Sequence, residues 1–149
     1  MRIEQAIKQK KFENEYQKLL VNLLYTTGQI SSAQSRLLKP YGISIQQYNV
    51  LRILRGQHPK SVSVSVVAER MLDKNSNASR LIDKLVKKKL IKRKVSECDR
   101  RQKNVVITAS GLKFLEPVDK KIREFQKHFE IISVNDAKKV NKILDQLRK

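Results

Sequence analysis

A run of amide, hydroxyl and cationic side chains lies at the start of a predicted helix near the middle of the chain, and along one face of it. Its members are Asn75, Ser76, Asn77, Ser79, Arg80 and Lys84. Side chains of these types hydrogen-bond base edges in the major groove and bind the phosphates of the backbone. Nothing in the run resembles the acid, base or nucleophile of an enzyme. The run therefore predicts contact with nucleic acid rather than catalysis.

Apolar residues define the helix that would carry this run. Ala78, Leu81, Ile82, Leu85 and Val86 recur at the spacing of one face of an α-helix. We expect that face to lie in the core, with the polar run on the opposite face. A polar face opposite an apolar stripe is also the ordinary surface of a solvated helix, so this second interpretation stays open.

A short β-hairpin is predicted to follow the helix. Leu90 to Val95 and Asn104 to Thr108 have the composition of strands, and the connection between them, SECDRRQK, holds the basic residues Arg100, Arg101 and Lys103. Next to a DNA-reading helix, these side chains predict at least one further contact with DNA. Arg101 is the first choice because a narrow minor groove attracts guanidinium groups. The alternative interpretation is an ordinary polar hairpin turn.

The charge of the chain favours a polyanionic partner. The 149 residues include 33 Lys and Arg against 14 Asp and Glu, which gives a net charge of +19. Nine basic side chains lie within residues 87–103, against two acidic ones. Double-stranded DNA is the expected partner and an anionic membrane is the weaker alternative. We expect the triple lysine at 87–89 to add general attraction, because a run of charge is usually solvated. A charge of +19 would also suffice for an architectural protein that binds DNA regardless of sequence.

Cysteine and histidine are too sparse for a disulfide framework or a metal site. Cys98 is the single cysteine, and His58 and His128 each lack a second ligand at a suitable spacing. We predict no cofactor, no metal and an inert Cys98, although neighbouring arginines would favour its thiolate. The N-terminus has no apolar run long enough for a signal peptide or a membrane span. These features predict a cytoplasmic protein that does not enter the membrane.

A helix-turn-helix is predicted ahead of the hairpin. A helix begins at the capping box formed by Ser44 and Gln47 and ends near Gly56. In residues 61–71 the pattern changes from that of a strand to that of a helix, so we predict a short β bridge at Val62 and then a helix to about residue 72. Its cap is Ser63 or Ser65. A turn at residues 73–75 and the helix described above complete the motif, and residues 39–108 form the predicted DNA-binding region.

The two ends of the chain have the patterns of long helices. Ile3 to Leu38 contains few helix breakers and predicts one helix. Thr108 is a candidate cap for a helix to Ile132, within which Pro117 would form a kink or lie in a loose first turn, and Ser133 opens a last helix. The apolar positions of the last two helices step by three and four residues, as in a heptad seam, which favours a partner helix. We expect residues 1–38 and 109–149 to form the dimerisation region, in which the terminal helices of two copies of the chain pack together as a homodimer. The alternative is a monomeric adaptor that binds a different protein.

Three segments, taken in order, resemble the MarR family of winged helix-turn-helix transcriptional regulators. They are PYGISIQQYNVLRIL (40–54), VSVVAERMLDKNSNASRLIDKLVKKKLIKR (64–93) and DRRQKNVVITASGLKFL (99–115). The resemblance implies a mainly α fold with a small β-hairpin wing, in a single domain whose N- and C-terminal helices dimerise. It also implies a regulator, most often a repressor, that binds a pseudo-palindromic duplex operator.

The resemblance further assigns roles to single residues. The second arginine of the wing motif, here Arg101, enters the flanking minor groove in such proteins, and Asp99 buttresses the wing. Family members often respond to small aromatic or phenolic compounds in the crevice between the dimerisation and DNA-binding regions. Redox-responsive members use a cysteine in the first helix, and this chain has none there.

Overall fold

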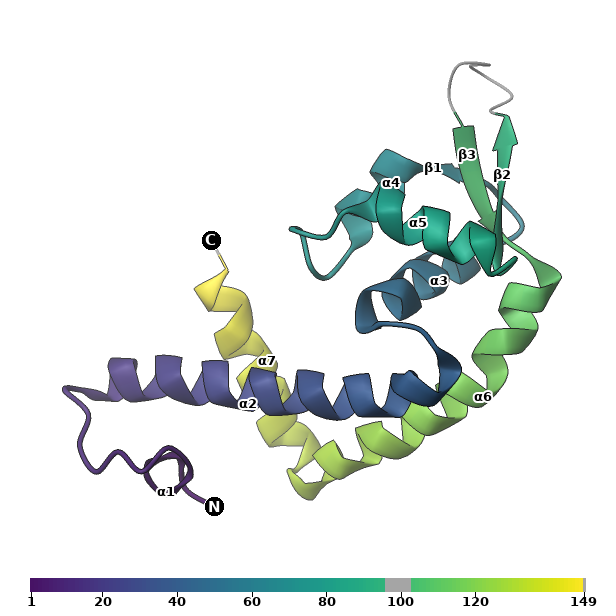
Figure 1. The fold of residues 1–149 in the computed structure, drawn as a ribbon. Helices are drawn as coiled ribbons and strands as arrows, with labels where there is room; N and C mark the ends of the chain where they lie inside the picture. Colours follow the sequence, from purple (N-terminus) through teal and green to yellow (C-terminus); the bar gives the residue numbers. More distant parts are fainter. Residues whose placement is uncertain (96–102, 149) are drawn as a thin grey trace.

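The computed structural model describes residues 1–95 and 103–148, which form a mainly helical fold with one small sheet (Figure 1). The N-terminal part contains α1 (Ile3–Ala6), α2 (Glu15–Leu38), a 3-10 turn (Lys39–Tyr41) and α3 (Ile45–Gln57). The middle contains β1 (Val62–Ser63), α4 (Val64–Arg70), α5 (Ala78–Lys87), β2 (Ile91–Val95) and β3 (Lys103–Ile107). The C-terminal part contains α6 (Ala109–Gln126), a 3-10 segment (Lys127–Ile131) and α7 (Val134–Leu147). The predicted fold class is confirmed.

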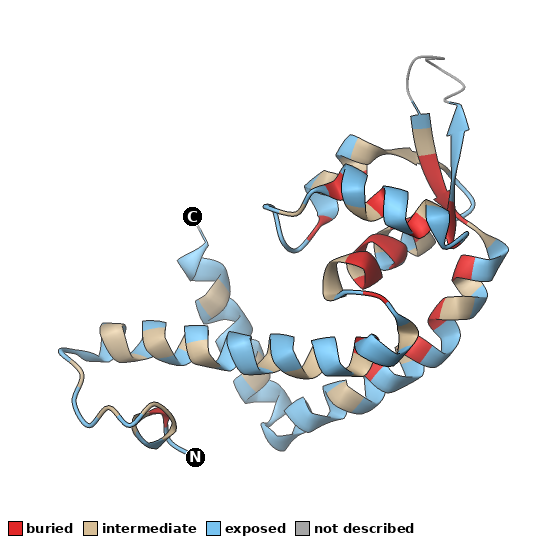
Figure 2. Ribbon diagram, viewed as in Figure 1, coloured by how far each residue is buried: buried red, intermediate tan, exposed pale blue. Residues whose placement is uncertain are grey.

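The hydrophobic core lies where α3, α4, α5, the first part of α6 and the sheet meet. The sheet is antiparallel in the order β1-β3-β2, with Val62 opposite Val105 and Ile91 opposite Ile107. Helix α5 contributes the fully buried Ile82 and Leu85, as its apolar spacing predicted. Burial is concentrated in this part of the molecule and is sparse towards both ends of the chain (Figure 2).

Side-chain caps set the starts of the helices. Ser44 and Gln47 form the predicted capping box, in which the Ser44 hydroxyl accepts from the Gln47 N–H at 3.1 Å. Ser63, rather than Ser65, caps α4. Thr108 caps α6 by accepting from the Gly111 N–H at 2.9 Å. Local hydrogen bonds that satisfy the first N–H groups of a helix therefore explain why these boundaries were predictable.

The first turn of α6 packs directly on the end of the hairpin. A Cβ atom at Gly111 would lie 2.1 Å from the carbonyl oxygen of Leu90, so only glycine fits there. The Thr108 hydroxyl also donates to the Lys89 carbonyl at 2.9 Å. The Thr108 N–H donates to the Leu90 carbonyl at 3.0 Å, so the wing and α6 are also joined through their backbones.

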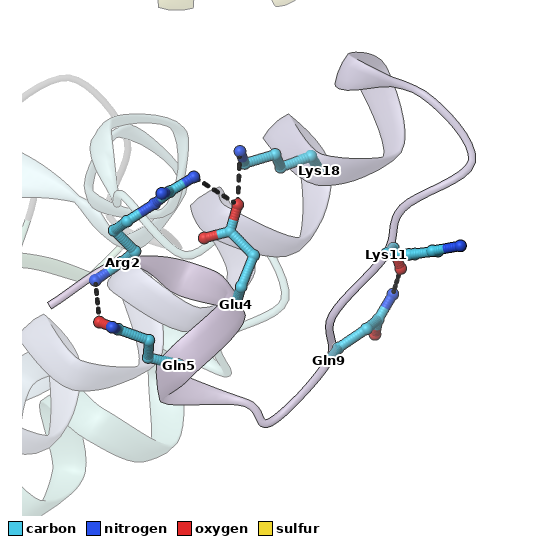
Figure 3. Close-up of polar contacts among 6 residues, drawn as sticks. All are labelled: Arg2, Glu4, Gln5, Gln9, Lys11 and Lys18. Carbon is cyan, nitrogen blue, oxygen red and sulfur yellow. Dashed lines mark hydrogen bonds and ion pairs between the residues drawn. The ribbon is translucent and has the colours of Figure 1, made fainter.

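The prediction of one helix from Ile3 to Leu38 is wrong. Helix α1 is a single turn, Lys8 has a left-handed φ of 55°, and α2 begins only after Asn14, whose side chain caps it by accepting from the Gln17 N–H at 2.9 Å. Figure 3 shows the turn held against α2 by Glu4, which pairs with Lys18 at 2.7 Å. This ion pair lowers the pKa of Glu4. The cap and the ion pair replace the continuous helix that the scarcity of breakers predicted.

The predicted helix from Thr108 to Ile132 also ends early. The α-helical part stops at Gln126 and a 3-10 segment follows. The Nδ1 atom of His128 lies 3.1 Å from the Phe125 carbonyl oxygen. In a continued α-helix that oxygen would accept from the backbone N–H four residues later, so the His128 side chain competes with the helix. Pro117 lies inside α6, and Ser133 caps α7 as predicted.

The terminal helices carry large apolar side chains that their own chain does not cover. No residue of α7 is buried, and α2 buries only its last residue, Leu38. The uncovered apolar residues of α2 are Tyr16, Leu19, Leu20 and Leu24, and those from the 3-10 segment onward are Phe129, Ile131, Ile132, Val134, Val140, Ile143 and Leu147. Both ends of the chain therefore present unpartnered apolar faces.

Candidate nucleic-acid interface

The exposed face of α5 and the turn before it carry five of the nine residues predicted to contact DNA. Asn75, Asn77, Ser79, Arg80 and Lys84 are all exposed, while the opposite face of the helix lies in the core. The Asn77 side chain caps α5 by accepting from the Arg80 N–H at 3.0 Å. Its amide oxygen is therefore engaged by the helix, and its NH2 group is the part left to reach a base.

Ser76 differs from its neighbours because it is half-buried. The Ser76 side chain and the Asn75 N–H lower the pKa of Asp73, and the Ser76 backbone N–H donates to the Asp73 carbonyl at 3.2 Å. The Asn75 N–H lies 3.0 Å from the Asp73 carboxylate. Ser76 thus stabilises the turn between α4 and α5, and it is the least suited of the predicted set to reach a base.

A hollow of about 430 Å³ lies at the start of α5. It is lined by Gln46, Asp73, Ser76, Asn77, Arg80, Leu81 and Lys84. Gln46 belongs to the first turn of α3 and is not among the residues predicted from the sequence. Its place beside Gln47 was the available signal, because Ser44 and Gln47 complete the capping box and do not need the Gln46 side chain.

Only part of the wing can be placed. Asp99, Arg100 and Arg101, together with Cys98, lie outside the described residues, so the roles predicted for them stay predictions. Lys103 begins β3 opposite Val95 and is exposed.

Three consecutive exposed basic residues, Lys92, Arg93 and Lys94, lie on β2. Arg93 forms an ion pair with Asp83 of α5. No sequence pattern indicates this pair, because its members are ten residues apart in different elements.

The triple lysine at the end of α5 lies away from the turn where base contact is expected. Lys87, Lys88 and Lys89 are exposed. The Lys88 ammonium donates to the Gly42 carbonyl at 2.8 Å, so it ties α5 to the turn before α3. Gly42 has a φ of 65°, a conformation that glycine adopts without strain.

A second cavity of about 470 Å³ lies between the helices of the chain ends and the DNA-binding region. Its lining residues are Gln34, Ile45, Tyr48, Asn49, Arg52, Ile53, Leu72, Ile122 and Gln126. They come from α2, α3, α6 and the turn before α5. This is the place where the resemblance implies an effector crevice.

Within residues 1–95 and 103–148, no group of three or more His, Cys, Asp or Glu side chains is arranged to hold a metal ion. In the same part of the chain, no helix combines the length and the apolar character that crossing a membrane requires.

Comparison with known proteins supports the resemblance of this chain to one family. Residues 41–102 match the model of the MarR family. The transcriptional repressor MprA of Escherichia coli is 29% identical over 121 residues, which cover 78% of this chain and 69% of MprA. The predicted resemblance of the chain to the MarR family is confirmed. The regulator PapX of E. coli is 32% identical over 87 residues, which are 58% of this chain and 53% of PapX, so this match spans only about half of that relative.

Solved structures of the MarR family share the fold. AbsC from Streptomyces coelicolor superposes with a TM-score of 0.78 at 19% identity, covering 93% of this chain and 95% of AbsC. A complex of S. aureus MepR with DNA gives a TM-score of 0.77 at 22% identity, covering 92% of this chain and 96% of MepR. The predicted family and the winged helix-turn-helix fold are confirmed, and the named relatives are transcriptional regulators rather than enzymes.

Proposed function

We propose that the chain is a homodimeric transcriptional repressor that binds a pseudo-palindromic duplex operator. The observation that carries the proposal is the exposed polar face of α5 next to the basic strand β2. Helix α5 and the turn before it would enter the major groove through Asn75, Asn77, Ser79, Arg80 and Lys84. Ser76 would shape the turn before it. Arg100, Arg101 and Lys103 of the wing would contact the flanking DNA, with Asp99 holding the wing.

Dimerisation is supported by the uncovered apolar faces of α2 and α7. Tyr16 and Val134 have exposed fractions of 84% and 72%. Several such residues on the helices at both ends of the chain expose more apolar surface than most monomeric proteins do. A second copy is the simplest partner, because a two-fold axis pairs two DNA-binding regions with two half-sites.

Repression and its release are proposed on two grounds. The relative MprA is named a transcriptional repressor. The cavity between α2, α3 and α6 has the size of a small-ligand site and contains Tyr48 and Arg52 among its polar groups. A small aromatic or phenolic compound would fit there and release the operator. The cytoplasm is the proposed location, since the operator is there.

The test is the ratio of affinities for a selected operator and a random duplex, measured at several salt concentrations. We expect a ratio well above ten and a steep fall of both affinities with salt, since phosphate contacts from the basic residues contribute to both. A ratio near one would favour the architectural alternative and would overturn the proposal.

A further inference from the structure

One carboxylate joins the DNA-binding region to the long helix α6. Asp119 of α6 accepts from the Tyr48 hydroxyl at 2.8 Å through Oδ1, and from the Arg55 guanidinium through Oδ2. Both donors belong to α3. The Asp119 side chain is 13% exposed and Tyr48 is 8% exposed, so water competes weakly for the bond between them, whereas the Arg55 side chain is 36% exposed.

The geometry of this clamp restricts two motions. Tyr48 and Arg55 are seven residues apart, which is about two turns of α3. Because they hold the two oxygens of one carboxylate, α3 can neither roll about its axis nor slide along α6 without losing a charge-assisted hydrogen bond. The other polar contact nearby, from the Tyr41 hydroxyl to the Pro117 carbonyl, is long at 3.5 Å.

The protonation states suit the clamp. Burial alone would raise the pKa of Asp119, but hydrogen bonds from Arg55 and Tyr48 outweigh it and hold the pKa below its usual value. Burial, together with the hydrogen bond to Asp119, raises the pKa of Tyr48 to about 12. The acceptor is therefore charged and the donor keeps its proton at neutral pH. A further charged group near Asp119 and Tyr48 is Arg52, whose guanidinium lies 5.9 Å from the centre of the Tyr48 ring.

We propose that Asp119 is a positioning residue that fixes the angle of the winged helix on the dimerisation helices, and with it the half-site spacing that the dimer accepts. This inference rests on the proposed function, because spacing has a meaning only for a dimer on an operator. The clamp lies beside a continuous apolar core in which α6 contributes Leu115, Val118 and Ile122. That core continues to join the two parts when the clamp is removed, so orientation should change more than folding.

The experiment uses the full chain and three kinds of duplex. These are the operator selected from genomic fragments, versions with one or two base pairs added or removed between the half-sites, and a duplex with one half-site scrambled. The variants are Tyr48→Phe and Asp119→Asn. The control is Glu124→Gln, which makes the same acid-to-amide change on α6 where the carboxylate pairs with Lys121 instead of α3. Thermal unfolding is measured for each protein.

We expect the wild type and the control to bind the native spacing best by a wide margin. Both clamp variants should bind the operator of native spacing with roughly tenfold lower affinity, which is the effect of about one lost buried hydrogen bond. Their affinity for the duplex with a single intact half-site should equal that of the wild type. The clamp variants should also differ less than the wild type in their affinities for duplexes of different half-site spacing. Tyr48→Phe removes one oxygen and keeps the ring, so it tests the clamp even if Asp119→Asn does not fold.

Unchanged spacing profiles in the folded clamp variants would overturn the clamp and leave the proposed function standing. Equal losses on the operator and the single half-site would also overturn it, since they indicate a purely structural role. A wild type that does not distinguish the operator from random DNA would overturn the proposed function itself.

Discussion

Arg93 on β2 pairs with Asp83 on α5, so an ion pair joins the wing strand to the helix that is proposed to read the operator. Both side chains are more than a third exposed. Such a pair contributes little to folding, and its importance is therefore expected to lie in the relative placement of the two DNA-contacting elements and in their charge.

Replacing Asp83 by Asn should raise affinity for random DNA. The change removes a negative charge near the DNA face and releases Arg93 to bind a phosphate. Fluorescence anisotropy on random and operator duplexes would measure a several-fold gain on random DNA, a smaller gain on the operator and therefore a lower specificity ratio. Asp145→Asn, which breaks the pair with Arg148 near the C-terminus, is the matched control. A gain of the same size in the control would contradict this expectation.

Arg80 and Lys84 should contribute differently to binding. Arg80→Ala should reduce the binding free energy by about 1 to 3 kcal/mol for the operator, and by much less for random DNA, if the Arg80 guanidinium hydrogen-bonds a base. Lys84→Ala should weaken the affinities for operator and for random DNA by similar factors, because the Lys84 ammonium would contact a phosphate. The slope of log affinity against log salt concentration should fall by about 1. Titrations at a series of salt concentrations separate the two effects. Identical behaviour of the two variants would argue against base reading by Arg80.

A charge on the apolar face of α7 should abolish the dimer. Val140 is 47% exposed in the single chain, and Val140→Asp would bury an unpaired carboxylate if a partner helix covers it. Light scattering coupled to gel filtration should then report the mass of one chain and weak operator binding. Ser110→Asp, at the exposed start of α6, is the control and should remain dimeric. A dimeric Val140→Asp protein would show that this face is not the interface.

The glycines offer a direct test of the contact between α6 and the hairpin. Gly111→Ala should destabilise the protein by about 3 kcal/mol, since the added methyl would overlap the Leu90 carbonyl. Gly28→Ala is the matched control because the space around that position in α2 is open. It should stabilise the protein by roughly 0.5 to 1 kcal/mol through helix propensity. Urea unfolding measures the free energy of unfolding of both variants. Equal changes in the two would show that the start of α6 does not pack against the end of the hairpin.

Stability at high pH should report on Tyr48. Its pKa is about 12 in the fold, against an ordinary value of 10.0. The folded protein therefore keeps this proton to higher pH than the unfolded chain, and the stabilisation is complete below pH 10 and is lost as the pH rises towards 12. The stability difference between the wild type and Tyr48→Phe should shrink by about 2 kcal/mol over that range. Urea unfolding at several pH values measures it, and a constant difference would contradict the raised pKa.

Local signals explain which parts of this fold were predictable. The caps at Ser44, Thr108 and Ser133 and the apolar spacing of α5 depend on residues a few positions apart, so the helix starts and the buried face followed from the sequence. The break before α2 depends partly on the pair of Glu4 with Lys18, whose members are fourteen residues apart.

Contacts between elements explain what was missed in the candidate site. Gln46 joins the α5 surface, and Asp119 joins α3 to α6, only because the chain folds back on itself. No spacing pattern within one element indicates such pairs. The exposed side chains of α5, by contrast, were predictable because an amphipathic helix buries one face and presents the other.

The order of the sheet places β2 at an outer edge, where its backbone lacks a neighbouring strand on one side. Open edges of this kind invite strands of other molecules to add on, which is a common start of aggregation. The consecutive charges of Lys92, Arg93 and Lys94 repel a second copy of the same strand. The residues that favour binding to a polyanion therefore also guard the protein against self-polymerisation when its DNA is absent.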